Sequence, residues 1–153
     1  MSHRLVLLAL ASLGATSAAA PTTVNVRVPV TLTVPNPCAS GDSVTLSGTV
    51  HLVGQVRTDD SGTTARLNVN LQNFGGRSEA ERLYRAQLNG KATLDLAATL
   101  LPATASGMVN ARLVSQGPTD NFGLKLRFDV SVDGNGNVTV TEPTAVPEGT
   151  CNG

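Results

Sequence analysis

The stretch that decides the fold reads FGLKLRFDVSVDGNGNVTV and runs from Phe122 to Val140. Apolar and polar residues alternate without a break from Phe122 to Val132, which is the period-two pattern of a strand with one buried and one solvent-facing side. The polar segment 133–137 then separates this strand from a second apolar stretch, 138–140. The pattern predicts a β-hairpin.

The register of this hairpin follows from which side chains must share a face. A two-residue loop, Asn135-Gly136, would set Val132 opposite Thr139 and place an apolar side chain against a polar one. A three-residue loop, 134–136, sets Val132 opposite Val138 instead and puts Gly136 where such a loop needs a left-handed residue. We therefore predict the three-residue loop, with positive φ at Gly136.

A second hairpin is predicted earlier in the chain. Residues 44–56 alternate at period two, with Gly48 and Gly54 on the apolar face, where glycine lets a strand coil or a neighbour approach closely. A four-residue loop, 59–62, keeps apolar residues opposite apolar ones and puts Gly62 where positive φ is expected. This register pairs Val56 with Ala65, Gly54 with Leu67, Leu52 with Val69 and Val50 with Leu71. Gly75-Gly76 is expected to end the returning strand.

Two further segments bear on the fold. Residues 24–34 alternate, but Pro29 cannot donate to a ladder, so this strand is expected at an edge or paired on one side there. Ser78-Glu79-Ala80-Glu81 is typical of a capping box and allows a short helix over Glu79–Leu88, whereas the alternation from Tyr84 to Leu96 indicates a strand. We favour one helical turn at 78–81 followed by strand.

Strands are also expected over 93–101, up to Pro102, and over 109–113. About eight strands result, nearly all joined by short hairpins, so consecutive strands should be neighbours. The predicted fold class is all-β: an antiparallel meander forming an up-and-down barrel or a coiled sandwich, with at most one short helical turn.

The start of the chain predicts export. Arg4 supplies positive charge, residues 5–13 are an apolar run, and small residues follow up to Ala19, after which we place cleavage. The run is too short to span a bilayer, which takes about 20 apolar residues. We therefore expect a signal peptide over 1–19 and a single secreted or periplasmic all-β domain over 20–153.

The cysteines and the charges fit such a compartment. Cys38 and Cys151 are the only two cysteines, and in an oxidising environment they are expected to form a disulfide that tethers an extended, irregular tail beginning at Thr141. Two free thiols or a metal pair are the alternatives. The sequence has 11 basic and 11 acidic residues, so loss of Arg4 leaves a net charge of −1. No basic stripe is visible in the sequence, and nucleic acid is not an expected partner.

Several motifs resemble a family of small secreted bacterial proteins of unknown function. The resemblance implies secretion and an all-β fold, and it implies no activity, cofactor or catalytic residue. The sequence departs from the family pattern around 78–85, which is more charged and more helix-like. The motifs are Pro37-Cys38, Leu46-Ser47-Gly48-Thr49-Val50-His51, Gln116-Gly117-Pro118 with Asn121-Phe122, and Asp133-Gly134-Asn135-Gly136.

Few residues suggest chemistry. His51 is the only histidine after the leader, and the predicted register puts Asn70 opposite it, with Arg66 on the same polar face. No nucleophile or carboxylate completes a triad on that strand face, so we interpret His51 as a solvated strand residue and keep these three only as polar-face candidates. Zinc would need three or four ligands. No catalytic, cofactor-binding or metal-binding residue is assigned, and no cofactor is expected.

The motif Asp133-x-Asn135-x-Asn137 copies the first ligands of a calcium loop. The sixth position would be Val138 in place of glycine, and the twelfth would be Thr144 in place of glutamate. A hairpin turn explains the same residues without a metal.

Three functions remain, in order of preference. The first is a non-enzymatic binding module of the cell envelope or extracellular space that takes a small apolar ligand or a partner in its interior or at its rim, where inward glycine and alanine leave space. The second is a structural envelope or surface protein. A hydrolase ranks third, because tryptophan for sugar stacking is absent and the carboxylates are scattered. These are Glu79, Glu81, Asp95, Asp129 and Glu142.

Overall fold

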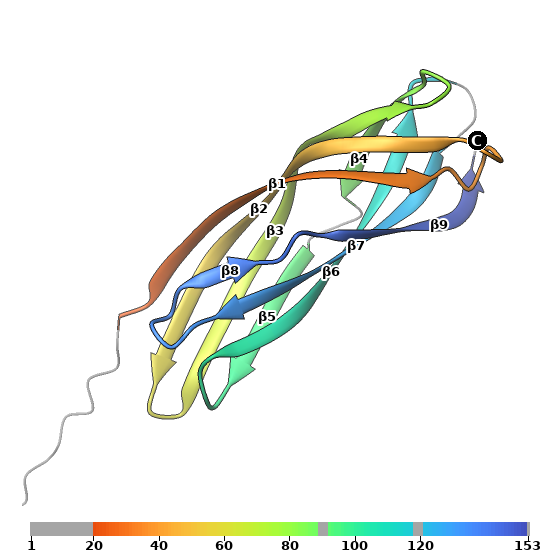
Figure 1. Ribbon diagram of the computed structural model, residues 1–153. Coiled ribbons are helices and arrows are strands. Elements are labelled where there is room, and N and C mark those ends of the chain that lie inside the picture. The colour runs from red at the N-terminus through yellow and green to blue at the C-terminus, as the bar shows by residue number, and fades with distance from the viewer. Residues whose placement is uncertain (1–19, 89–91, 118–120, 153) are drawn as a thin grey trace, which may run out of the picture.

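The structure, a computed structural model, describes residues 20–88, 92–117 and 121–152. These residues form nine strands and no helix (Figure 1). The strands are β1 (Thr22–Pro35), β2 (Ser43–Asp59), β3 (Gly62–Ser78), β4 (Leu83–Leu88), β5 (Ala92–Ala98), β6 (Ala103–Ser115), β7 (Asn121–Val132), β8 (Val138–Val140) and β9 (Thr144–Asn152). The expected signal peptide, 1–19, lies outside the described residues.

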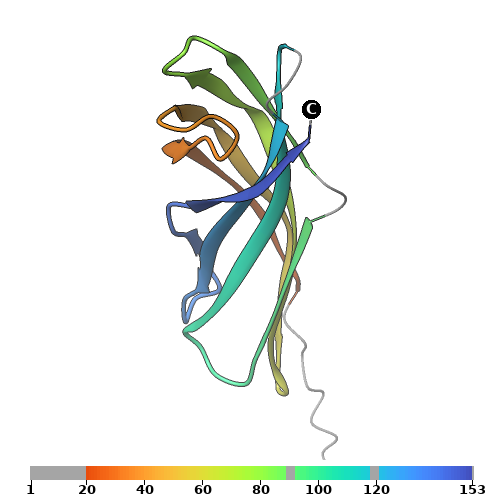
Figure 2. The same cartoon turned by 90° about the vertical axis from the view of Figure 1, so that its right-hand side faces the viewer.

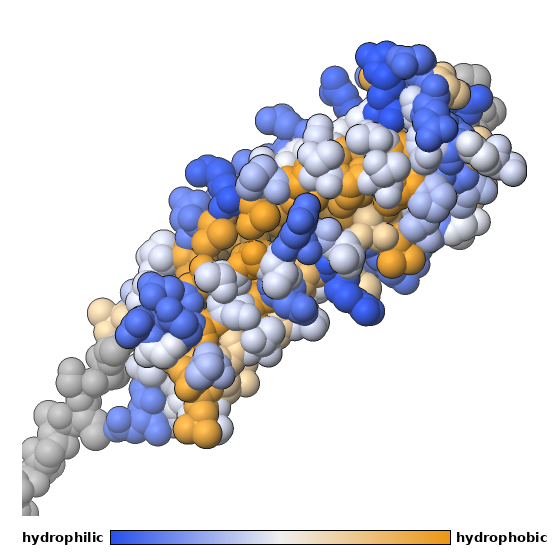
Figure 3. Space-filling model, in the orientation of Figure 1, coloured by the Kyte–Doolittle hydropathy of each residue, from blue (hydrophilic) through white to orange (hydrophobic). Residues whose placement is uncertain are grey.

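All nine strands belong to one antiparallel sheet that curls into a half-barrel (Figure 1 and Figure 2). The sheet runs β1-β2-β3-β4-β6-β7-β8, with β5 also pairing β3 and β9 also pairing β7. The predicted all-β antiparallel meander is confirmed, with nine strands in place of about eight. Apolar side chains form a band along the open side of the half-barrel, between β1 and β8, while the upper right end is mostly hydrophilic (Figure 3).

The register of the opening hairpin is confirmed. Val132 pairs with Val138 and Val130 with Val140, and the loop between them contains Gly136 with a φ of 82°. The Asp133 N–H donates to the Asn137 carbonyl at 3.0 Å and closes the three-residue loop. Apolar alternation and one left-handed glycine are therefore enough to set this hairpin.

The β2–β3 hairpin also has the predicted register, from Val56 opposite Ala65 to Val50 opposite Leu71. Asp59 pairs with Gly62, so the loop proper is two residues long, and Gly62 has the expected positive φ. The edge position of β1 is confirmed as well, since among the nine described strands β1 pairs only with β2.

Three expectations about chain segments are wrong. Ser78–Glu81 is a β-turn joining β3 to β4, closed by the Glu81 N–H on the Ser78 carbonyl at 2.9 Å, because β4 returns directly along β3. Gly75-Gly76 does not end β3, which continues to Ser78. The tail after Thr141 is not irregular, since β9 pairs with β7 along most of its length and Pro147 occupies an edge position that needs no donor on its outer side.

The disulfide between Cys38 and Cys151 is present, with 5.5 Å between the two Cα atoms. Cys38 lies in the loop after β1 and Cys151 lies in β9, so the bond joins the two sides of the half-barrel at one end (Figure 1). Among the described residues there is no helical segment with the length and hydropathy of a bilayer-spanning helix.

The inward glycines do not leave the interior space that the sequence suggested. A Cβ atom on Gly48 would lie 2.7 Å from Cδ2 of Phe74, and one on Gly107 would lie 2.7 Å from the ring of Phe128. Both phenylalanines are buried. Aromatic rings therefore occupy the room above these glycines, as close packing of a protein core requires.

Candidate functional site

The ladder of β3 changes partner partway along the strand. Residues 63–69 of β3 pair with β5, and residues 75–77 pair with β4. Residues 70–74 lie between these two segments. On the same side of β3 they pair with none of the described residues. Beyond this point β4 pairs with β6, from Tyr84 to Leu88. Among the described residues, the wall of the half-barrel therefore has an opening between β3 and β4.

A β-bulge in β3 lies at this opening. The β2–β3 register shifts between Ser47 and Thr49, so that two residues of β3, Asn73 and Phe74, oppose Gly48 alone. Asn73 has a φ of 51°, a left-handed conformation that asparagine adopts more readily than most residues. Phe74 turns inward onto Gly48, where no side chain competes for the space. The bulge therefore interrupts the regular alternation at the place where the ladder changes partner.

A pocket of about 720 Å³ occupies the opening. Its floor consists of apolar residues that point toward the interior, namely Leu71, Phe74 and Ala86. Leu83, on the outer side of β4, adds an exposed apolar side chain to the rim. The volume falls within the range of about 300–1,000 Å³ that is typical of small-molecule sites.

The rim of the pocket is cationic. Arg77 and Arg85 line it, and the lining contains no acidic residue in the described part of the chain. Arg77 forms an ion pair with Glu81, with 2.6 Å between Nη1 and Oε2. The side chain of Arg85 makes no ion pair or hydrogen bond with the described residues. The side-chain amide of Gln116 adds a neutral donor and acceptor at the rim.

Gly75 sets the spacing of the two strands beside the pocket. A Cβ atom at this position would lie 2.6 Å from the Tyr84 carbonyl oxygen and 3.7 Å from Cγ of Arg85. Only glycine therefore allows β3 and β4 to approach this closely beside the stem of Arg85.

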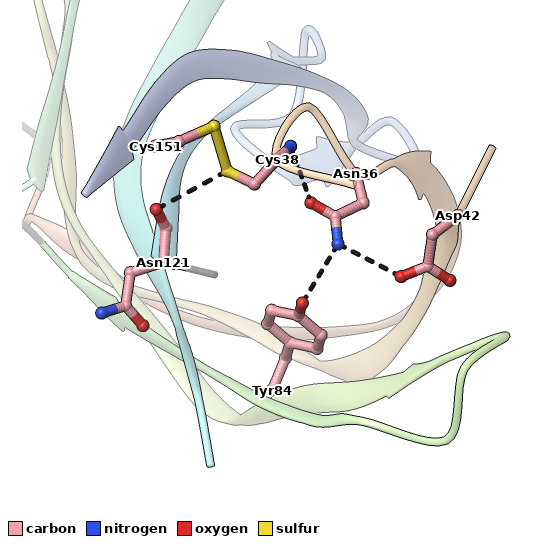
Figure 4. The surroundings of a disulfide bond; sticks show 6 residues. All are labelled: Asn36, Cys38, Asp42, Tyr84, Asn121 and Cys151. Atoms are coloured by element: carbon pink, nitrogen blue, oxygen red, sulfur yellow. Dashed lines mark hydrogen bonds between the residues drawn. A yellow bond between two sulfur atoms is a disulfide. The ribbon is translucent and has the colours of Figure 1, made fainter. Parts of the chain in front are cut away.

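A buried polar network holds β4 from the inner side (Figure 4). The Asn36 Nδ2 donates to the Tyr84 hydroxyl at 3.1 Å and to Asp42 at 3.2 Å, while its Oδ1 accepts from the Cys38 N–H at 3.0 Å. Burial raises the pKa of Tyr84, which the hydrogen bond from Asn36 partly offsets. Tyr84 also packs edge-on against Phe122, with ring centroids 5.8 Å apart. One end of β4 is thus fixed to the loop that carries the disulfide.

Sequence analysis missed this pocket. The signal was present, because Leu71 and Phe74 are three residues apart and so break the period-two alternation immediately before Gly75-Gly76. We took the glycine pair as a strand end, whereas a bulge explains both features.

Comparison of the chain with protein-family models, with curated proteins and with solved structures finds no match. The resemblance to a family of secreted bacterial proteins stays a prediction. The pocket and the polar residues of the outer face are therefore the basis for assigning a function.

The expectation of a solvated His51 is wrong, because only 9% of its surface is exposed. Its Nε2 lies 2.8 Å from Oδ1 of Asn25, and its Nδ1 lies 3.0 Å from Nε2 of Gln72. The two amide side chains cover the ring from neighbouring strands. The arrangement suits a donor at Nε2 and an acceptor at Nδ1.

The three polar-face candidates do not form a single site. Asn70 lies directly opposite His51, as the register predicted. Arg66 lies further along β3, where its Nε is 3.5 Å from Oδ1 of Asp95 on β5. This pair borders a smaller hollow of about 460 Å³ on the outer face of β2, β3 and β5.

The side chain of Asp133 serves the hairpin turn. Its Oδ1 accepts the N–H groups of Asn135 and Asn137, each at 2.8 Å, and its Oδ2 accepts the Asn137 amide at 2.9 Å. The Asn137 side chain and the loop N–H groups hold the pKa of this carboxyl below its usual range. Within the described ranges, no three His, Cys, Asp or Glu residues are grouped so that they could hold a metal ion.

Proposed function

We propose that this protein is an exported, non-enzymatic binding domain that holds a small ligand in the pocket between β3 and β4. The observation that carries the proposal is the pocket of about 720 Å³, with its apolar floor and cationic rim. An apolar lining with a few polar groups that fix orientation is the usual composition of a ligand site. This site lies in the wall of the half-barrel, whereas the sequence suggested the interior or the rim.

The surroundings of the titratable residues favour binding over catalysis. Both nitrogens of His51 are bonded to amide groups, which leaves neither free to transfer a proton to a substrate. Of the strand carboxylates, Asp95 pairs with Arg66, and Asp129 accepts a hydrogen bond from Ser106 at 2.6 Å. These contacts tie each group to its own part of the sheet surface.

Export is the second part of the proposal. It is supported by the leader-like composition of residues 1–19 and by the disulfide between Cys38 and Cys151, which fits an oxidising compartment such as the periplasm or the extracellular space. In such a compartment the domain meets ligands that come from outside the cell or from its envelope.

Native mass spectrometry of the exported protein, purified from its source organism, tests the proposal. We expect a co-purifying small molecule, and we expect Ala86→Leu, which narrows the floor of the pocket, to reduce its occupancy. Ala97→Leu, on the exposed face of β5, is the matched control and should keep the ligand. An empty chain that self-associates would support the alternative, a structural envelope or surface protein.

A further inference from the structure

We propose that the ligand of this pocket is an amphiphile with one anionic head group, a carboxylate or a phosphate, and an apolar chain. This inference rests on the proposed function and names the chemistry of the ligand. The head group pairs with Arg85, and the chain lies on the floor formed by Leu71, Phe74 and Ala86.

Arg85 is suited to receive the head group. It lies on the exposed face of β4, and its Cγ is within 3.7 Å of the place that a side chain on Gly75 would take. Arg85 also lines the pocket directly. A guanidinium group binds a carboxylate or a phosphate through two parallel hydrogen bonds, and no described residue makes such bonds to Arg85.

The two acidic residues of the β3–β4 turn are engaged elsewhere. Glu81 is paired with Arg77, and Glu79 accepts a hydrogen bond from Ser43 at 2.7 Å. Both belong to the β3–β4 turn, outside the lining of the pocket. The rim therefore keeps a net positive charge from Arg85, which favours an anionic ligand over a neutral or cationic one.

The apolar floor and rim favour a ligand that carries an apolar chain in addition to its anionic group. Leu71 and Ala86 are only partly covered by neighbouring residues, and Leu83 is 39% exposed at the rim. A free phosphate ion would pair with Arg85 but leave this apolar surface in water. An apolar chain attached to the anion would remove it from water and gain the hydrophobic contribution as well.

The test compares laurate with lauryl alcohol, which share a chain and differ in the head group. Binding to the exported protein, with its disulfide intact, is measured by calorimetry below the micelle concentration of each probe. We expect laurate to bind about tenfold to a hundredfold more tightly, which is the range for a hydrogen-bonded charge. Arg85→Gln should abolish this difference, while Arg27→Gln, on the exposed face of β1, should preserve it.

A second variant separates the chain from the head group. Ala86→Leu fills part of the floor, so we expect it to weaken laurate and lauryl alcohol by the same factor. Circular dichroism of each variant verifies that the β-fold is retained.

Each contrary outcome has a distinct meaning. Equal affinity for laurate and the alcohol, or a preference for laurate that survives Arg85→Gln, would overturn the anionic head group on Arg85 while leaving a ligand site in place. Inorganic phosphate that competes as well as laurate would overturn the amphiphile. If neither probe binds and the exported protein carries no small molecule, the proposed function itself fails.

Discussion

Phe74 packs directly on Gly48 across the bulge: a Cβ atom on Gly48 would lie 2.6 Å from Cα of Phe74 and 2.7 Å from its Cδ2. Two features of the molecule depend on this contact. The ring fills the interior beneath β2, and the backbone around it leaves the regular ladder at the edge of the pocket. The absence of a side chain at Gly48 therefore lets the Phe74 ring fill the core, and it also accommodates the bulge beside the pocket.

We expect Gly48→Ala to destabilise the protein by about 1–3 kcal/mol, because the new methyl group meets backbone as well as ring atoms of Phe74 and neither can move freely. Urea denaturation measures the change from the midpoint at constant m-value. Gly117→Ala is the control, since nothing lies within 4 Å of a Cβ atom there. Equal effects of the two substitutions would show that Phe74 does not rest on Gly48.

The disulfide should contribute strongly to stability because it closes a long loop. Cys38 and Cys151 are separated by 113 positions, for which the chain-entropy estimate is about 4–5 kcal/mol. We expect the double substitution Cys38→Ser with Cys151→Ser to lower the free energy of unfolding by about 2–5 kcal/mol.

Hydrogen exchange locates the effect of the same double variant. Exchange should rise first in β9, an edge strand that pairs only with β7 and is held at its far end by the bond. Uniform loss of protection over the sheet would contradict a role in tethering β9.

The hairpins could be predicted from the sequence because each depends on neighbouring residues. Alternation assigns every side chain of β7 and β8 to a face, and Gly136 then selects one loop length, so no distant contact is needed. The same holds for β2 and β3 as far as Leu71. The pairing of β9 was missed because Pro143 and Pro147 suggested irregular chain, although an edge strand tolerates proline on its unpaired side.

The pocket could not be predicted in the same way because it arises where three strands meet. β3 leaves β5 at Val69 and meets β4 at Gly75, and no local pattern fixes which partner a strand takes along each part of its length. The burial of His51 was missed for a similar reason. Its cover comes from Asn25 and Gln72, which reach it from positions diagonal to it on the two neighbouring strands.

Tyr84 gives a pH-dependent prediction that a simple spectrum can test, since it is the only tyrosine and tryptophan is absent. Burial raises its pKa above the ordinary value of 10.0. Because the pKa of the Tyr84 phenol is higher in the folded state, its protonated form stabilises the fold. This stabilisation is present below pH 10.0 and is lost as the pH rises through the folded-state pKa.

Absorbance of the ionised phenol should therefore appear at higher pH in the native protein than in urea. The loss of stability in alkali should be smaller in Tyr84→Phe, which has no phenol to ionise. A native titration that coincides with the unfolded one would show that Tyr84 is accessible to water, in conflict with its burial beneath the pocket.

The last prediction concerns the two glycines of the β7–β8 loop. Gly136 has a φ of 82°, whereas Gly134 lies outside the positive-φ region, and a Cβ atom on either would meet nothing within 4 Å. A side chain at either glycine would therefore avoid contact with neighbouring atoms, and only the backbone conformation differs between the two positions. We expect Gly136→Ala to cost about 1 kcal/mol and Gly136→Val more, because a side chain at positive φ crowds its own backbone.

Gly134→Ala should cost less, since its backbone suits any residue. Gly136→Asn is a second control, because asparagine adopts the left-handed conformation more readily than alanine and should recover part of the loss. Urea midpoints at equal m-value, with the disulfide intact, give the ranking. If Gly134→Ala were the more damaging change, the loop would be of another type. Val132 would then not face Val138, and the hairpin on which the fold prediction rests would have a different register.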